Sequence, residues 1–188
     1  MKIMTNKREQ PDVGVYLSRV VQVTNLGHQP GFVWNGKKIE SSYKIELTYE
    51  LINEKMQDGR PFWVSEELTN TDNEKGNLRQ RVQAAGVTFD TFEQILGRAV
   101  TVTVEHNDKG YSKVVNVAGV PSGYNVGELE NPMTMFDIYS TEPDLDVFKA
   151  FPAFKRGKIE AALDFKEQVL YAELLSSGYF DDKDDGEL

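Results

Sequence analysis

RPFWVSEELTNTDNEKGNLRQRVQAAG, residues 60–86, decides the fold of this 188-residue chain, because it joins a strand to a helix through a polar turn. In residues 60–68 the side chains alternate, with Phe62 and Val64 on one face and Trp63 on the other. Alternation of this kind is typical of a half-buried strand. We therefore expect Phe62 in the core and Trp63 on the outer face.

The second half of the stretch has the period of a helix. Leu78 and Val82 are one helical turn apart, and Gly86 suits the end of the helix. Asp72 or Asn73 is expected to cap its start. The apolar side chains would face the core, while three cations would project from the remaining surface: Lys75, Arg79 and Arg81.

Four more segments predict strands. The five predicted strands are residues 13–25, 41–53, 60–68, 98–105 and 111–120. Residues 41–53 alternate most clearly, with Tyr43 and Tyr49 toward the core and Glu46 and Glu50 toward solvent. Five strands with a helical insertion between the third and the fourth is the chain order of an OB-fold, a partly open barrel that binds oligonucleotides. The predicted fold class is therefore mainly β, with an OB-fold barrel.

The rest of the chain surrounds this barrel. Residues 26–38 predict a turn-rich loop that carries Phe32 and Trp34, and residues 90–96 predict a second short helix. Residues 144–173 are helical in composition and offer apolar surface for the barrel or for a partner copy. The predicted parts are a flexible arm (1–12), the OB-fold domain (13–120), a linker with a helical extension (121–175) and a disordered acidic tail (176–188).

The negative charge of the chain is unevenly distributed. The net charge is -9, yet residues 1–119 contain 15 Lys and Arg against 15 Asp and Glu, whereas residues 120–188 contain 6 against 15. A neutral front half and an acidic end are what a binding domain with an acidic interaction tail would show.

Several function classes are excluded or disfavoured by composition. There is no cysteine and there are only two histidines, His28 and His106, so thiolate chemistry is excluded and a metal centre is not expected. P-loop, G-x-G-x-x-G and G-x-S-x-G motifs are missing, and the densest acids form a terminal run that offers no rigid metal site. We expect no catalytic residue, metal or cofactor. No apolar run approaches the roughly 18 residues of a membrane span, and residues 1–10 lack the apolar centre of a signal peptide, so we expect a cytoplasmic protein with no membrane partner.

The candidate functional residues are rings and cations on the open face of the barrel, because single strands are held by base stacking on aromatic rings and by Lys or Arg at the phosphates. The predicted nucleic-acid contacts are Trp34, Lys37, Lys38, Lys44, Arg60, Trp63, Lys75, Arg79, Tyr111 and Lys113. Each of these residues could instead have a structural role. Tyr111 shares the side of Val115 and Val117, so a structural role is expected for it more often than binding. Tyr43 and Tyr49 are expected in the core for the same reason.

Five segments resemble one known family in order and spacing. They are YLSRVVQVTNLGHQPG, YKIELTYEL, PFWVSEELT, NEKGNLRQRVQAAG and ILGRAVTVTVEHNDKGYSKVVNVAGV, which together cover residues 16–120. They resemble the OB-fold single-stranded DNA-binding proteins of bacteriophages. The resemblance implies single-stranded DNA binding with little sequence preference in phage DNA replication or recombination, within the infected bacterial host.

The resemblance also gives the acidic end a role. Acidic C-terminal tails of such proteins recruit replication or recombination partners and compete with DNA. The residues that this implies for partner binding are Phe180, Asp181, Asp182, Asp184, Asp185 and Glu187. This chain departs from the pattern because it ends Gly-Glu-Leu without a terminal aromatic residue.

Three functions stay open on the sequence. The leading hypothesis is a DNA-coating protein whose helical extension offers a surface for a homo-oligomer. The alternative is a protein-interaction or scaffold module, or a DNA mimic, that does not bind DNA. A third is strand annealing in recombination, which the sequence does not separate from coating.

Overall fold

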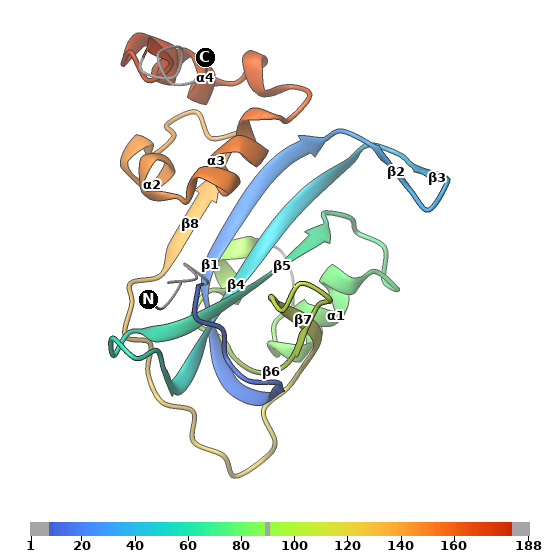
Figure 1. Cartoon of the computed structure of the whole chain (residues 1–188), viewed down its shortest axis with the longest axis vertical. Coiled ribbons are helices and arrows are strands. Elements are labelled where there is room, and N and C mark those ends of the chain that lie inside the picture. Colours follow the sequence, from blue (N-terminus) through green and yellow to red (C-terminus); the bar gives the residue numbers. More distant parts are fainter. Residues whose placement is uncertain (1–7, 89–90, 182–188) are drawn as a thin grey trace, which may run out of the picture. The chain divides into compact units, whose positions relative to one another are not determined.

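The fold is mainly β. This computed structural model describes residues 8–88 and 91–181, which form eight strands, four α-helices and two short 3-10 helices (Figure 1). The strands are β1 (Gly14–Gln29), β2 (Phe32–Trp34), β3 (Lys37–Ile39), β4 (Ser42–Lys55), β5 (Pro61–Thr69), β6 (Ala99–His106), β7 (Ser112–Ala118) and β8 (Thr134–Asp137). The α-helices are α1 (Asn77–Ala84), α2 (Leu145–Ala150), α3 (Ala153–Glu160) and α4 (Val169–Ser176), and the 3-10 helices are Phe92–Ile95 and Phe165–Glu167.

One large antiparallel sheet contains the five strands that the sequence predicted. Its order is β5-β4-β1-β6-β7, and β8 pairs with β1. Within the described residues no pair of strands closes this sheet into a barrel. The mainly β class is therefore confirmed, whereas the OB-fold barrel stays a prediction because the described strands do not close. β8 was missed because four residues are too few to show a period.

Strand β4 corrects the expectation of a half-buried strand. Glu46, Thr48 and Glu50 were predicted to face solvent, but all three are buried, and Glu50 is only 1% exposed. Glu46 pairs with the buried ammonium of Lys155, and Glu50 accepts hydrogen bonds from three donors described below. Both faces of β4 are covered, so its polar face is part of the interior. On the other face Tyr49 is buried as predicted, whereas Tyr43 is exposed.

Helix α1 confirms the predicted apolar face and corrects one cation. Leu78 and Val82 are buried, and Gly86, with φ +68°, follows the end of the helix. The helix begins at Asn77 rather than at the predicted caps, because the Asn73 side chain accepts from the backbone N–H of Lys75 in the preceding turn. Arg81 does not project into solvent but is buried against Glu66.

The chain divides into two compact units. Unit 1 gathers the described residues of Met1–Gln22, Thr48–Glu66 and Gln80–Met133. It contains the β1–β6 pairing, from Gly14↔Val104 to Arg19↔Ala99, and the β6–β7 hairpin with a bulge between Thr103 and Val104.

The N-terminal arm corrects a second expectation within unit 1. Residues 1–12 were predicted to be flexible, but the described end of this arm makes several contacts with unit 1: Pro11 is buried and its carbonyl is 2.7 Å from His106 Nε2. Gln10 accepts from the backbone N–H of Ser112, and Glu9 accepts from that of Gln57. Residues 1–7 lie outside the described residues.

Unit 2 gathers the described residues of Val23–Leu47, Glu67–Arg79 and Thr134–Leu188. Its core is a cluster that β8 and the C-terminal helices form with Leu26; the buried members include Phe136, Ile138, Phe148, Ile159 and Leu170. Gly27 of β1 faces this cluster with φ +77°, and a Cβ there would meet Ile138 and Ala162 at 3.1–3.2 Å. A glycine is therefore required at this position of the strand.

The end of the described chain corrects the predicted tail boundary. Phe180 was assigned to a disordered tail, but its ring lies 5.1 Å from Tyr179 and 5.7 Å from Tyr171, and Tyr179 packs edge-on against Phe148. Phe180 is thus part of the unit 2 packing rather than a free docking residue. Asp181 is exposed, and the other predicted partner-binding acids (Asp182, Asp184, Asp185 and Glu187) lie outside the described residues.

The predicted helix at residues 90–96 is a single 3-10 turn, Phe92–Ile95, whose Ile95 is buried. Thr91 precedes it without a side-chain cap, and residue 90, where the predicted helix began, lies outside the described residues.

Candidate nucleic-acid interface

The ten predicted nucleic-acid contacts divide between the two units. Unit 2 contains Trp34, Lys37, Lys38, Lys44, Lys75 and Arg79. Unit 1 contains Arg60, Trp63, Tyr111 and Lys113. Each group is considered within its own unit.

The predicted loop at residues 26–38 is instead the end of β1 followed by a two-stranded hairpin, β2–β3. The turn is Asn35–Gly36, with φ of 47° and 75°, the positive values that a tight two-residue hairpin turn requires. The register pairs Phe32 with Ile39, Val33 with Lys38 and Trp34 with Lys37. The turn residues were identified from the sequence, but three-residue strands are too short to show alternation.

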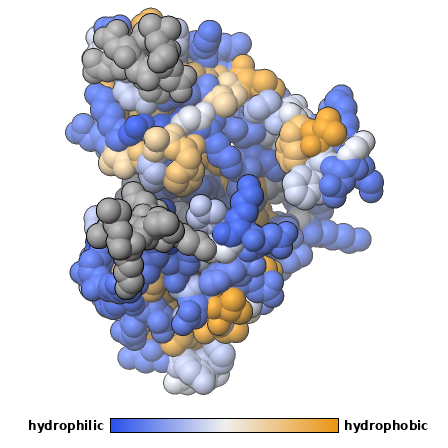
Figure 2. All heavy atoms as spheres, viewed as in Figure 1, coloured by the Kyte–Doolittle hydropathy of each residue, from blue (hydrophilic) through white to orange (hydrophobic). Residues whose placement is uncertain are grey.

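Every residue from 31 to 40 is exposed, so both faces of the hairpin are open within unit 2. Directly paired residues share a face, and alternate rungs share it too. One face therefore carries Phe32, Trp34 (65% exposed), Ile39 and Lys37, and the opposite face carries Val33 and Lys38. Figure 2 shows the hydrophobic surface gathered on this hairpin, at the right of the view.

The exposure of two large rings, Phe32 and Trp34, on one small hairpin needs an explanation. Soluble proteins rarely leave contiguous large apolar side chains in water unless the patch binds something. A two-stranded hairpin alone is only marginally stable in water, so these rings add little to the stability of the fold. Their arrangement favours a binding surface with two rings on one face and a lysine on the same rung as Trp34.

The other unit 2 cations differ in their exposure and in the contacts they already make. Lys38 is 3.0 Å from Glu40, but both side chains are about three-quarters exposed, so this ion pair is weak. Lys44 donates to Thr69 Oγ1 at 3.0 Å and is half-buried. Lys75 is exposed in the turn before α1, and Arg79 is half-buried on α1.

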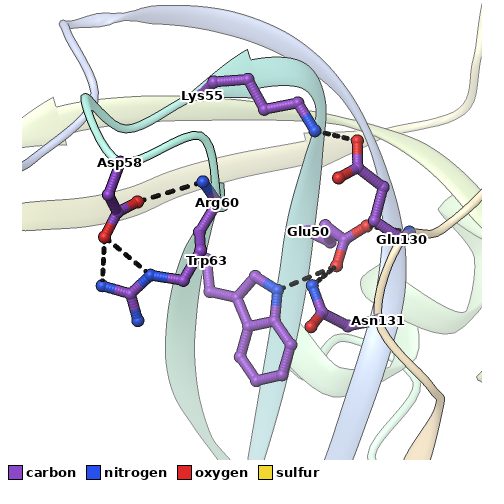
Figure 3. Close-up of polar contacts among 7 residues, drawn as sticks. All are labelled: Glu50, Lys55, Asp58, Arg60, Trp63, Glu130 and Asn131. Carbon is purple, nitrogen blue, oxygen red and sulfur yellow. Dashed lines mark hydrogen bonds and ion pairs between the residues drawn. The ribbon is translucent and has the colours of Figure 1, made fainter.

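Trp63 in unit 1 is held by a buried carboxylate. Its indole Nε1–H donates to Glu50 Oε2 at 3.0 Å, and Glu50 also accepts from the backbone N–H of Glu130 (2.6 Å) and from Asn131 Nδ2 (2.7 Å) (Figure 3). The indole is 36% exposed, so its orientation is fixed while part of the ring stays open. The sequence predicted the outward position of Trp63 but gave no sign of the acceptor.

The charges near Trp63 are paired rather than free. Arg60 binds Asp58 through Nε at 2.8 Å and its terminal nitrogen at 2.6 Å, and this hydrogen bonding lowers the pKa of the Asp58 carboxyl and raises that of Arg60. Lys55 likewise pairs with Glu130 (Figure 3). The Arg60 side chain is 73% exposed and leaves one terminal nitrogen outside this pair, so Asp58 weakens a phosphate contact without blocking it. With Asp58 and Glu130 beside the cations, this neighbourhood is less suited to an anionic ligand than the hairpin.

The remaining unit 1 pair lies at the β6–β7 turn. Tyr111 is 49% exposed, so the expectation of a structural, core-side ring is wrong. The bulge between Thr103 and Val104 shifts the register, so the assumption that Tyr111 and Val117 face the same way fails. Lys113 is exposed and pairs in register with Glu105, whose opposite charge lies across the strands.

Three rings in unit 2 were not selected from the sequence. His28 and Tyr43 stack with centroids 4.6 Å apart and planes 13° from parallel, and Tyr139 lies 6.4 Å from Tyr43. Tyr139 donates to Asp164 Oδ2 at 2.7 Å; burial, then this carboxylate, raises its pKa. The only sequence signal for the group is the aromatic character of Tyr43 on a strand next to the hairpin.

Other kinds of site find little support. A hollow of about 870 Å³ in unit 1 is lined by both signs of charge, and its Arg19 is already engaged by the carbonyls of Gly97, Val126 and Gly127. No group of three or more acidic or histidine side chains able to hold a metal occurs in residues 8–88 and 91–181. Among the helices described, none is both long and apolar enough to cross a membrane.

Comparison with known proteins gives no match among protein families, curated proteins or solved structures. Function must therefore be argued from the chemistry of the side chains.

Proposed function

We propose that this protein binds single-stranded DNA as a non-enzymatic coating protein, with bases stacked on the rings of the β2–β3 hairpin and phosphates on its lysines. The observation that carries the proposal is the exposure of Phe32 and Trp34 on one hairpin face, with Lys37 on the same rung as Trp34. The setting would be DNA replication or recombination of a bacteriophage, as the sequence resemblance implies.

The spacing of the two rings suits single strands. Phe32 and Trp34 are two residues apart on one strand, about 6.6 Å along it, so each can accept a separate base. Stacking contributes about 1–3 kcal/mol per base and tolerates any sequence, because every base has a π-face. A duplex would keep its bases stacked inside and offer them to neither ring.

The strand order supports a relation to the OB-fold. β1 lies between β4 and β6, and β5 and β7 are the outer strands. An OB barrel has five strands and is partly open. We propose that the sheet is an opened version of that barrel, with α1 as its helical insertion.

A second candidate, a protein-interaction module, is favoured by the other face of the hairpin. Val33 is 71% exposed on that face, and an aliphatic side chain offers a base no ring to stack on. A partner protein could cover both faces at once. The paired charges around Trp63 also give no clear attraction for DNA.

The two tryptophans allow a direct test. Trp63→Phe leaves Trp34 as the only indole, and Trp34→Phe leaves Trp63. Titration with oligo-dT should quench the fluorescence of the Trp63→Phe protein, and added salt should reverse the quenching. Trp34→Ala combined with Phe32→Ala should weaken binding by about 1–3 kcal/mol for each base that loses its ring.

The controls separate the candidates. Val33→Thr on the opposite face should leave DNA affinity unchanged but weaken a protein partner. If neither single-tryptophan protein is quenched and no salt-sensitive complex forms, DNA binding is excluded. Faster pairing of complementary strands in the presence of the protein would indicate annealing rather than coating.

A further inference from the structure

The stacked pair of His28 and Tyr43 lies where the hairpin begins. β1 ends at Gln29 and β2 starts at Phe32, while β3 ends at Ile39 and β4 starts at Ser42. The chain thus leaves β1 and returns into β4 through the hairpin, and β1 and β4 are neighbours in the sheet. The two rings occupy these two strands, within unit 2.

The register of β2–β3, extended into β1 and β4, reaches this pair. In β2–β3 the partners are Phe32↔Ile39 and Trp34↔Lys37, and stepping the same register four residues back from Phe32 pairs His28 with Tyr43. The structure places these two rings in face-to-face contact at 4.6 Å. His28 Nε2 is also 3.0 Å from Ser41 Oγ, the diagonal neighbour on that face.

Period-two alternation then puts both sets of rings on one face of the ribbon. His28 on β1 is separated by even numbers of residues from Phe32 and Trp34 on β2, and Tyr43 on β4 is likewise separated from Ile39 on β3, although β2 and β3 form a sheet of their own. From Trp34 to His28 the ribbon is at most about 20 Å long. This is long enough for several nucleotides of an extended strand.

The pair is preorganised and open. Tyr139 packs beside Tyr43 and is itself fixed by its hydrogen bond to Asp164. Tyr43 nevertheless stays 49% exposed. Neither His28 nor Tyr43 belongs to the buried unit 2 cluster. An ordered ring with an open surface loses little conformational freedom when a base stacks on it.

We infer that the His28–Tyr43 stack is a second base-binding platform, so that one DNA strand runs from Trp34 along the hairpin to Tyr43. This inference rests on the proposed function, since it assigns a further part of the same binding face. It predicts that affinity depends on oligonucleotide length, because a short strand reaches only the hairpin rings.

The test compares oligo-dT of two nucleotides, a length that only two rings spaced as Phe32 and Trp34 can fill, with oligo-dT of about 10 nucleotides, within the site sizes of single-strand binders. Tyr43→Leu keeps an apolar side chain without a π-face. It should weaken binding of the longer strand by about fivefold or more and leave the shorter one unchanged. Tyr43→Phe should behave as wild type, and so should Tyr124→Leu, a matched control at an exposed tyrosine of unit 1.

A second variant keeps the test valid if Tyr43→Leu fails to fold. In a protein with Tyr43→Trp, Trp34→Phe and Trp63→Phe, the only indole reports on position 43, and the longer strand should quench it more than the shorter one. The inference would be overturned if Tyr43→Leu bound both lengths with the affinity of wild type. It would also be overturned if Tyr43→Leu lost the same fraction of affinity for the shorter and for the longer strand. If wild type binds neither length, the proposed function itself fails.

Discussion

At the scale of single residues, Glu66 is a carboxylate shared by two partners inside unit 1. Arg81 donates to it through Nε at 2.8 Å and a terminal nitrogen at 2.9 Å, and the Tyr49 hydroxyl donates at 2.7 Å. The side chains of the ion pair are less than a tenth exposed. The trio links α1 to β4 and β5, so the helix position depends on a satisfied buried charge.

Removing one partner of this pair should be strongly destabilising. Arg81→Met would leave the Glu66 carboxylate buried without its cation, and we expect a loss of about 3–5 kcal/mol in the free energy of unfolding. Urea denaturation at neutral pH measures it. The matched control is Arg60→Met, whose ion pair with Asp58 is exposed to solvent, so its loss should be much smaller than that of Arg81→Met. Similar losses for both variants would show that burial of the pair does not matter.

Tyr49 makes stability depend on alkaline pH. Burial, and then the Glu66 carboxylate, raises the pKa of Tyr49 well above its ordinary value of 10.0. The folded state holds this proton where the unfolded chain releases it. Its contribution is therefore complete below about pH 10 and is lost as pH rises, by up to about 1.4 kcal/mol per pH unit.

The variant that tests this is Tyr49→Phe. It should lose about 1 kcal/mol at neutral pH with its hydrogen bond, yet show a shallower decline between about pH 9 and pH 11. Tyr139→Phe should flatten the curve further, since the Tyr139 pKa is raised as well. If the free energy of unfolding of Tyr49→Phe fell with pH as steeply as that of wild type, Tyr49 would not be the source of the alkaline loss.

At the scale of elements, the β2–β3 hairpin is separable from the fold. None of residues 31–40 is buried, so replacing them with a short Gly-Ser linker removes no core contact. We expect the free energy of unfolding to change by less than about 1 kcal/mol, because surface changes are usually small. Oligo-dT binding should be strongly weakened, because both hairpin rings are removed. A shortened protein that folds and still binds DNA with wild-type affinity would show that the hairpin is not the site.

The elements that could be predicted were those with one buried face. In β5 the predicted inward residues Phe62 and Val64 are buried, and in β6 the alternating Val100 and Val102 are buried. The prediction for β4 was wrong because the partners of its two acids come from distant parts of the chain. Lys155 pairs with Glu46, and Glu130 and Asn131 donate hydrogen bonds to Glu50. Sequence period measures local amphipathicity, and it carries no information on such long-range partners.

The candidate site was predictable to the same degree. Trp34, Lys37 and Lys38 were selected correctly as exposed residues around a turn, because Asn35–Gly36 is a strong local signal. Their hairpin register and the stack of His28 on Tyr43 required the pairing of two strands. The Arg60–Asp58 pair was missed although the residues are two apart, since proximity in sequence does not say which partner a cation chooses.

At the scale of the whole molecule, charge decides how DNA binding responds to salt. Each phosphate neutralised on a single strand steepens the salt dependence, log K against log[salt], by about 0.7. Contacts by Lys37, Lys38 and Lys44 together predict a slope of about -2. Lys37→Gln should reduce its magnitude by about 0.7 for every oligonucleotide sequence, measured by titration at several salt concentrations. Lys166→Gln, an exposed lysine outside the proposed face, should leave the slope unchanged.

The acidic end should oppose binding through its field. Residues 182–188 contain four acids and one lysine, so ending the chain at Asp181 changes the net charge from -9 to -6. The cut spares Tyr179 and Phe180, which pack in unit 2. The truncated protein should bind oligo-dT more tightly at low salt, and the difference should shrink near 1 M salt, where the Debye length falls to about 3 Å. Replacing the same acids by Asn and Gln should reproduce the effect, which separates charge from length. If truncation leaves the affinity unchanged at low salt, the tail does not compete with DNA, and its acids are then best explained by a separate basic partner.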